Sequence, residues 1–203
     1  MESSAPLMTP TESSGVAVKM IAVLCVSRNS VYKQIKGVDS YDEDRDARTF
    51  PGGIPAVAHP PCRCYSAFCR HQAKPKDRES EMALGVWCVD QVRKWGGVIE
   101  QPAHSKLWET CGLPQPKDRN AAECAWSMEL PQFWFGDVRE KNTWLFFSRI
   151  PRADVPKLPF RLKPEGGDRR AWQLMSSKNQ REKTPMQFAQ WLVECARRCE
   201  VTS

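Results

Sequence analysis

Apolar residues occur along the chain in short runs separated by polar stretches, which is the pattern of a globular α/β domain. Residues 16–26 (VAVKMIAVLCV) are rich in β-branched residues and predict a buried strand. The polar segment 27–30 (SRNS) predicts a turn with an N-cap residue, and a short helix follows in VYKQIKG. Val38-Asp39 predicts the start of a second short strand.

Two further strands and a helix are predicted in the middle of the chain. The segments 54–61 (IPAVAHPP) and 98–102 (VIEQP) are each an apolar strand that ends at proline. Between them, residues 81–95 repeat apolar residues at helical spacing, and Gly96-Gly97 follows at the position where glycine commonly caps a helix. The face that this helix is expected to bury consists of Met82, Val86, Val89 and Val92.

The last third of the chain predicts a hairpin and a closing helix. The aromatic runs 133–135 (FWF) and 143–147 (TWLFF), separated by Gly136-Asp137, predict an antiparallel hairpin. Residues 184–199 predict a C-terminal helix that starts with Thr184 as N-cap and Pro185 as first helical residue. This order of elements predicts an α/β fold with a mixed, mostly parallel Rossmann-like sheet, flanking helices and a terminal antiparallel hairpin.

The size and composition of the chain predict one folded domain. With 203 residues, of which 41% are hydrophobic and 27% charged, residues 16–203 can form a single α/β domain with a buried core. Residues 1–15 are polar and lack the basic segment of a secretory signal, so we expect a disordered tail. No window approaches the roughly 18 apolar residues that a membrane helix needs, so we expect no membrane partner and a cytoplasmic location.

The nine cysteines are an odd number in a chain without an export signal, which favours reduced thiols over a disulfide framework. Four of the residues that could bind zinc cluster together, namely Cys62, Cys64, Cys69 and His71. Their spacing, Cys-x-Cys-x4-Cys-x-His, lacks the Cys-x2-Cys pair that commonly wraps zinc, so we predict no metal site. The acidic segment 42–46 lacks the glycine of an EF-hand loop and predicts a solvated loop.

The net charge is +6, and the basic residues are concentrated in one segment. Residues 161–183 contain seven Lys or Arg against three Asp or Glu, together with a tryptophan and a glycine pair. Such a segment can bind phosphates and stack on a base, so it predicts a DNA contact surface; the alternative is a solvated loop. The residues predicted to contact DNA phosphates are Arg161, Lys163, Arg169, Arg170 and Trp172.

Two predicted strands end in segments that combine proline with a reactive or polar side chain. AVAHPPC places Cys62 on a stiff loop, and GVIEQP places Glu100 and Gln101 at a strand end. Because ligands bind beyond the carboxyl ends of parallel strands, we expect Cys62 and Glu100 to face one pocket. A thiolate can add to an electron-poor carbon, and a carboxyl group can hydrogen-bond to a ring nitrogen of the same substrate. The alternatives are an inert thiol and a carboxylate that accepts backbone N–H groups.

The ordered motifs AHPPC, GGVIEQPAHSKLW and QFWFGDVREKNTW resemble those of small phage-encoded proteins related to the DNA cytosine-C5 methyltransferases. In that family a Pro-Cys loop supplies the nucleophile that attacks C6 of cytosine, and a Glu-Asn-Pro or Glu-Asn-Val strand end supplies the carboxyl that binds the pyrimidine edge. The resemblance implies that Cys62 is the nucleophile and Glu100 the base-binding carboxyl, with Pro61 and Pro102 stiffening their loops. It also implies DNA as partner and, for a phage protein, the host cytoplasm as location.

Two departures from the family pattern change the expected chemistry. Gln101 stands where the family has asparagine. The family also opens with a strand and a glycine-rich turn that binds S-adenosylmethionine, whereas the strand at 16–26 runs into SRNS without a glycine. Backbone cannot approach a cofactor closely past side chains, and only about 35 residues separate this strand from Pro61, too few for a complete cofactor half. We therefore predict weak or no binding of S-adenosylmethionine and leave the group donor open.

The function favoured by these observations is a phage-type DNA-modifying transferase that acts on a pyrimidine base. The alternatives are a catalytically inactive DNA-binding or anti-restriction decoy protein, an enzyme acting on free nucleotides, and a structural protein; a homo-oligomer is also open. His59 and His104 lie beside the strand-end prolines and are candidates for tuning Cys62 or holding a phosphate. The substrate-binding residues expected at this site are His59, Pro61, Gln101, Pro102, His104, Ser105, Gln132 and Lys141.

Overall fold

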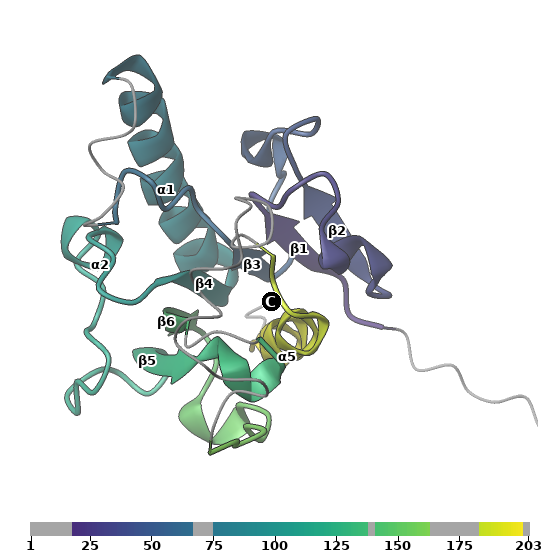
Figure 1. Ribbon diagram of the computed structural model, residues 1–203, viewed down its shortest axis with the longest axis vertical. Coiled ribbons are helices and arrows are strands. Elements are labelled where there is room, and N and C mark those ends of the chain that lie inside the picture. Colours follow the sequence, from purple (N-terminus) through teal and green to yellow (C-terminus); the bar gives the residue numbers. More distant parts are fainter. Residues whose placement is uncertain (1–17, 67–74, 138–140, 163–182, 201–203) are drawn as a thin grey trace, which may run out of the picture.

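The computed structural model describes residues 18–66, 75–137, 141–162 and 183–200, and these residues form a six-stranded sheet (Figure 1). The strand order is β2-β1-β3-β4-β6-β5. The first four strands pair in parallel, whereas β6 pairs antiparallel with both β4 and β5, so the predicted mixed α/β sheet is confirmed. The strands are β1 (Ile21–Leu24), β2 (Val38–Tyr41), β3 (Ala56–Ala58), β4 (Gly97–Pro102), β5 (Ala125–Pro131) and β6 (Asn142–Ser148).

Helices cover both faces of the sheet, because side chains along each strand alternate between the two faces. Val23, Val57 and Val98 belong to the core on the face covered by α5. Their neighbours Leu24 and Ile99 belong to the core on the face of α1 and α2. The helical elements are α1 (Pro75–Trp95), α2 (Leu107–Thr110), α5 (Met186–Arg197) and the short 3-10 helices η1 (Val31–Gln34), η2 (Ala47–Thr49), η3 (Gln132–Phe135) and η4 (Arg152–Asp154).

The C-terminal helix α5 packs against β1 and the short connection from β1 to β2. The parallel strands β1 and β2 are joined by the 3-10 helix η1 rather than by an α-helix. Helix α5 contacts η1, β1, β3 and β4 (Figure 1). The side chains that this helix buries against the sheet include Phe188, Trp191, Leu192 and Cys195. The end of the chain thus supplies the apolar layer that a longer crossover helix would otherwise provide.

The antiparallel hairpin lies at the edge of the sheet, but one of its predicted strands is wrong. Residues 133–135 lie in η3, and the partner of β6 is β5, which ends just before them. Phe135 packs against two residues of α5, with ring centroids 4.9 Å from Phe188 and 5.4 Å from Trp191. The aromatic run therefore contributes to the core under α5, and the less apolar segment before it completes the sheet.

Three other boundaries and faces differ from the sequence-based expectation. Strand β1 begins only at Ile21, because Val18 and Met20 are exposed. Helix α5 begins at Met186 with Pro185 as the N-cap residue, so Thr184 does not cap it. Helix α1 begins at Pro75, well before the predicted start at 81. The predicted tail 1–15 lies outside the described residues.

The face that α1 buries is rotated from the predicted one. Met82 is exposed and Val86 is only half-buried, whereas Gly85 and Cys88 join Val89 and Val92 on the buried face. The reason is Tyr65, because a Cβ atom on Gly85 would lie only 2.5 Å from its Cε2. The glycine lets this ring pack against the helix, and the Tyr65 hydroxyl donates a hydrogen bond of 2.7 Å to the Met82 carbonyl. The segment after β3 is thereby attached to α1.

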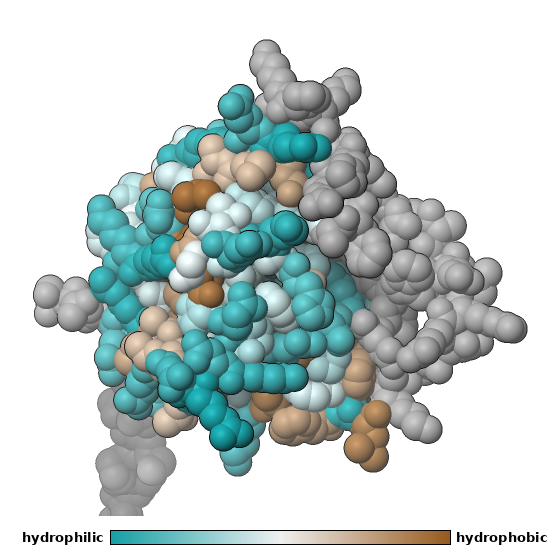
Figure 2. All heavy atoms as spheres, turned by 90° about the vertical axis from the view of Figure 1, so that its left-hand side faces the viewer, coloured by the Kyte–Doolittle hydropathy of each residue, from teal (hydrophilic) through white to brown (hydrophobic). Residues whose placement is uncertain are grey.

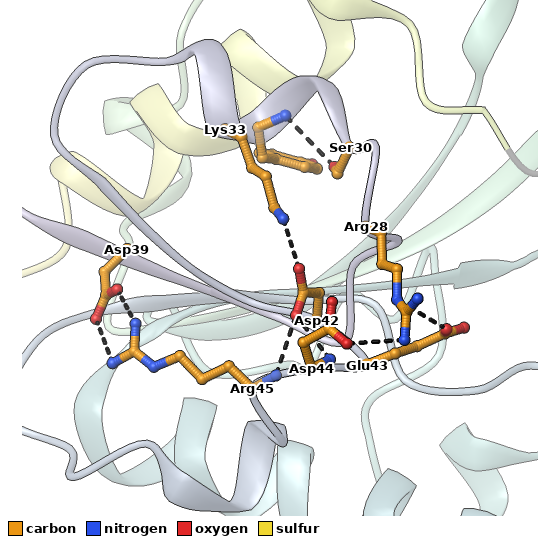
Figure 3. Close-up of polar contacts among 9 residues, drawn as sticks. Arg28, Ser30, Lys33, Asp39, Asp42, Glu43, Asp44 and Arg45 are labelled. Carbon is orange, nitrogen blue, oxygen red and sulfur yellow. Dashed lines mark hydrogen bonds and ion pairs between the residues drawn. The ribbon is translucent and has the colours of Figure 1, made fainter.

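The charged segment after β2 is a surface loop held by ion pairs, as predicted (Figure 3). Arg28, in the turn after β1, lies 2.7 Å from Asp44. Lys33 of η1 lies 2.5 Å from Asp42, and this hydrogen bond lowers the pKa of Asp42 to about 2. These pairs connect the turn after β1 with the loop after β2.

The face that lies on the left in Figure 1, with α1 and α2, presents mainly hydrophilic residues (Figure 2). Its hydrophobic atoms occur in small, separate areas. Among the residues described, no helix combines the length and apolar character needed to cross a bilayer.

Candidate functional site

The candidate site lies at the carboxyl ends of β1, β3 and β4. From β1 the chain proceeds outward to β2, and from β3 it proceeds in the opposite direction to β4, although β1 and β3 are neighbours. Such a point of divergence leaves a crevice in an open α/β sheet, and ligands commonly bind there. The segments that border it here are the turn after β1, the segment His59–Cys62 after β3 and the end of β4.

His59 and Glu100 come together because β3 and β4 are parallel and in register. Ala58 pairs with Ile99, so the two following residues lie next to each other on the α5 face. The Nδ1 atom of His59 lies 3.0 Å from Oε2 of Glu100. Both side chains are almost completely buried, which makes this contact part of the interior.

Glu100 is a buried carboxylate with several hydrogen-bond donors. Gln132 donates from Nε2 to its Oε1 at 3.1 Å, and the hydroxyl of Thr143 donates to the same oxygen. Burial raises the pKa of Glu100, but the His59 hydrogen bond, the charge of Lys141 and the Thr143 hydrogen bond together lower it to about 2. Glu100 is therefore ionised at neutral pH and acts only as an acceptor, so His59 donates from Nδ1.

Tyr32 completes the chain of hydrogen bonds on the other side of His59. Its hydroxyl oxygen lies 2.8 Å from Nε2 of His59, and the two ring centroids are 5.2 Å apart. Burial and the charge of Glu100 raise the pKa of Tyr32 well above its usual range, so the phenol is protonated. His59 donates from Nδ1 to Glu100 and shares a hydrogen bond with the Tyr32 hydroxyl through Nε2, so both ring nitrogens have a partner.

Local sequence explains how Tyr32 reaches this position. The Ser30 side chain caps η1 by accepting a hydrogen bond from the Tyr32 backbone N–H at 3.4 Å. Tyr32 is fully buried in the core shared with α5. Sequence reasoning placed a helix here but assigned no role to Tyr32 or Thr143. The sequence signal for Tyr32 is a tyrosine two residues after a serine cap.

A second hydrogen-bonded group lies on the opposite face of the sheet and holds the two proline segments together. The Gln101 side chain donates from Nε2 to the carbonyl of Pro60. Ser105 donates to Oε1 of Gln101 at 3.2 Å, and its own oxygen accepts the N–H of Leu107 at 3.3 Å. Gln101 and Ser105, both predicted to bind substrate, are thus buried residues that connect the ends of β3 and β4.

Cys62 lies on the exposed turn that follows the two prolines. Its carbonyl accepts hydrogen bonds from the backbone N–H groups of Tyr65 at 3.0 Å and Ser66 at 2.8 Å. Because Tyr65 is attached to α1, the backbone of this turn is well supported. The arrangement presents a solvent-accessible thiol a few residues beyond the His59–Glu100 pair.

Gln132 has one polar atom without a partner. Its Nε2 donates to Glu100, and its Oε1 is buried and accepts no hydrogen bond from the described residues. Exchanging the two amide atoms would place an oxygen against the carboxylate, so the orientation is determined by Glu100. A buried amide oxygen without a donor costs about 1–3 kcal/mol, and a bound N–H group would recover it.

The other predicted substrate-binding residues occupy the rim. His104 is exposed in a left-handed backbone conformation (φ 63°), with its ring 4.9 Å from that of Trp144. Lys141 is half-buried, and its carbonyl accepts the Gln132 N–H at 2.9 Å. Pro61 and Pro102 are half-buried. Of the predicted DNA-phosphate residues only Arg161 lies within the described residues; Lys163, Arg169, Arg170 and Trp172 lie outside them.

The residues after β1 do not fit S-adenosylmethionine, the donor that the resemblance implies. No glycine occurs from Cys25 to Ser30, and the left-handed backbone conformation falls on Cys25 (φ 61°). Val26 is buried, and the Tyr32 ring packs against the His59 ring, with centroids 5.2 Å apart.

Within the described ranges no group of three or more His, Cys, Asp or Glu residues is arranged to hold a metal ion. Cys69 and His71 lie outside those ranges. Comparison of the chain with protein-family models, curated proteins and solved structures finds no match.

Proposed function

We propose that the chain is a DNA base-modifying enzyme that uses the Cys62 thiolate as nucleophile toward a pyrimidine base. The observation that carries this proposal is that two neighbouring parallel strands are followed by an accessible thiol on one and end in a buried, ionised carboxylate on the other. The Gln101–Pro60 hydrogen bond connects the segments that bear them. This arrangement supports attack on one face of a planar ring whose edge is held by polar groups.

The proposed first step needs no group donor. The Cys62 thiolate forms a bond to C6 of the pyrimidine, and the electron pair of the C5–C6 double bond moves to C5, which takes a proton from water. Loss of the original C5 proton and expulsion of the thiolate restore the base with a solvent-derived hydrogen at C5. A group donor could intercept the same C5 carbanion, and its identity is open.

Glu100 and Gln132 are proposed to hold the edge of the base. Among the described residues, Oε2 of Glu100 accepts from His59 alone, so its second lone pair is available to an N–H group of the substrate. The unpartnered oxygen of Gln132 is a second acceptor beside it. His59 orients Glu100, which makes His59 a positioning residue in this scheme.

The test is exchange of the C5 hydrogen of cytosine in duplex and single-stranded oligonucleotides incubated with the protein in deuterated water. Mass spectrometry of the nucleosides should show deuterium at C5 with the unchanged protein and none with Cys62→Ser. Cys111→Ser, which alters a half-buried thiol elsewhere, is the matched control and should retain exchange. Exchange that survives in Cys62→Ser would disprove the nucleophile, and no exchange in the unchanged protein would disprove the enzyme.

A catalytically inactive DNA-binding or decoy protein is the second candidate. One argument for it is the turn after β1, which does not fit S-adenosylmethionine. A second is that His59, Gln132 and Thr143 already occupy most acceptor positions of Glu100. This candidate predicts that Cys62→Ser binds duplex DNA as tightly as the unchanged protein while neither catalyses C5 exchange. Loss of exchange only in the variant favours the enzyme instead.

A further inference from the structure

Two thiols from distant parts of the chain lie in contact behind the candidate site. Cys25 follows β1 directly, and Cys88 lies in the middle of α1, 63 positions later. Their Sγ atoms are 3.6 Å apart. Cys88 is fully buried, whereas Cys25 is half-buried and therefore reachable from solvent.

This contact joins the end of β1 to α1, two elements whose buried residues share one core cluster. Cys25 packs on the core cluster that contains Cys88, on the α1 face of the sheet. A disulfide has an S–S bond of about 2.05 Å, so the two sulfurs need to approach by about 1.5 Å. A rotation of the half-buried Cys25 side chain, together with a small backbone adjustment, can supply a displacement of this size.

The two thiols differ in solvent exposure, so that an oxidant can reach Cys25 more easily than Cys88. The hydrogen bond between Cys88 and Cys25, together with burial, raises the pKa of Cys88 well above its usual range. Burial likewise raises the pKa of Cys195 and of Cys199, which are buried in the other core cluster. Oxidants react with accessible thiolates, so Cys25 is the member of the pair that reacts first.

We propose that Cys25 and Cys88 form a reversible dithiol–disulfide pair that responds to a peroxide. The Cys25 thiolate attacks one peroxide oxygen and becomes a sulfenic acid, and the other oxygen leaves as hydroxide or water. The Cys88 sulfur then attacks the Cys25 sulfur, the S–S bond forms, and the sulfenic oxygen departs as water with the Cys88 proton. The pair loses two electrons and two protons in total, and the peroxide is reduced.

The disulfide would connect β1 to α1 at the start of the turn that leads to Tyr32. The same strand end supplies the Leu24 carbonyl that accepts the His59 backbone N–H at 3.0 Å. The cross-link therefore acts on the backbone that positions two members of the Tyr32–His59–Glu100 chain. This inference does not depend on the proposed function, because it concerns only the two sulfur atoms.

The test is peptide mapping of the folded, full-length protein after treatment with limiting hydrogen peroxide, alkylation of the remaining thiols and trypsin digestion. Trypsin releases Cys25 in residues 20–28 and Cys88 in residues 79–93, each as the single cysteine of its peptide. We expect a linked pair of these peptides, lighter by two hydrogens than their sum, which dithiothreitol separates. The linked pair should exceed every other cysteine pair at least tenfold.

Matched variants complete the test. Cys25→Ser should leave Cys88 reduced and open to alkylation after denaturation, whereas Cys124→Ser, which removes another half-buried thiol, should leave the linked pair unchanged. The proposal is overturned if Cys25 is oxidised to a sulfinic acid with no link to Cys88. It is also overturned if the folded protein yields the same mixture of cysteine pairs as the urea-unfolded protein.

Discussion

His59 and Glu100 follow two neighbouring parallel strands and meet at 3.0 Å between Nδ1 and Oε2. The contact extends to Tyr32 on one side and to Gln132 and Thr143 on the other, so five polar residues from five segments form one buried chain. Because each buried polar group needs a partner, removing one member leaves the next unsatisfied.

Stability should depend on pH through Glu100. The pKa of this carboxyl is about 2 in the folded chain, against an ordinary value of 4.5, because its hydrogen bonds and the charge of Lys141 outweigh burial. The stabilisation is therefore complete above about pH 5 and is lost as the pH falls from about 4.5 to 2, with a total of about 3 kcal/mol. Urea unfolding at a series of pH values measures it.

The Glu100→Gln variant isolates this contribution, since Asp42 titrates in the same range. We expect the variant to be less stable than the unchanged protein at pH 7 and the difference to shrink toward pH 2. Glu109→Gln, at an exposed position of α2, is the control and should follow the unchanged protein. A pH-independent difference for Glu100→Gln would contradict an ionised Glu100.

Tyr32→Phe should destabilise the chain by about 1–2 kcal/mol, because it removes the phenol hydroxyl that bonds to the buried His59. Tyr41→Phe is a suitable comparison, since its hydroxyl contacts Asp39 at 3.0 Å and Arg45 at 2.8 Å, two side chains that are partly exposed to solvent. Water can solvate Asp39 and Arg45 when the hydroxyl is removed, so a smaller loss of stability is expected there. If chemical denaturation shows that both variants lose the same free energy of unfolding, burial does not strengthen the Tyr32–His59 hydrogen bond.

Isothermal titration calorimetry should detect weak or no binding of S-adenosylmethionine. The turn after β1 carries side chains at every position from Cys25 to Ser30, and the Tyr32 ring packs against His59. Side chains prevent the close approach of backbone to the cofactor that glycines allow. Binding in the micromolar range would refute this prediction and restore methyl transfer from this donor.

DNA affinity should fall steeply with salt if the segment 161–183 contacts phosphates. Replacing Arg169 and Arg170 by alanine should weaken binding to all sequences about equally and flatten the salt dependence by roughly one to two units, because fewer counterions are released. The matched control replaces Lys106 and Arg119, two exposed residues outside that segment. Fluorescence anisotropy at several salt concentrations gives both quantities. An unchanged slope in the Arg169/Arg170 variant would mean that DNA docks elsewhere.

Trp172 is expected to stack on an unpaired or flipped base. Its replacement by alanine should weaken single-stranded DNA binding by about 1–3 kcal/mol and change duplex binding less. Anisotropy with matched single-stranded and duplex oligonucleotides distinguishes the two. Equal effects on both would assign Trp172 to folding rather than to stacking.

The sequence by itself determined the elements whose signal is local. The proline-terminated strands around His59 and Glu100 are visible because proline removes a backbone donor, and the helix between them because its apolar residues recur at helical spacing. Gly96 ends that helix in the left-handed conformation (φ 82°) that glycine allows without strain. Since the two strands are parallel, their carboxyl ends had to meet at one edge, and this geometry predicted that Glu100 belongs to a site.

The tertiary structure alone decided which side chains reach that edge. Tyr32 and Thr143 complete the network from segments far away in the chain, and no local pattern specifies a hydrogen bond over such a separation. The pairing of β6 with β5 was also decided by tertiary structure. The run 133–135 has a stronger strand propensity than the β5 segment, but Phe135 of this run packs against α5 instead. Long-range packing overrides propensity because a buried aromatic side chain gains more from filling a core than from a preferred backbone conformation.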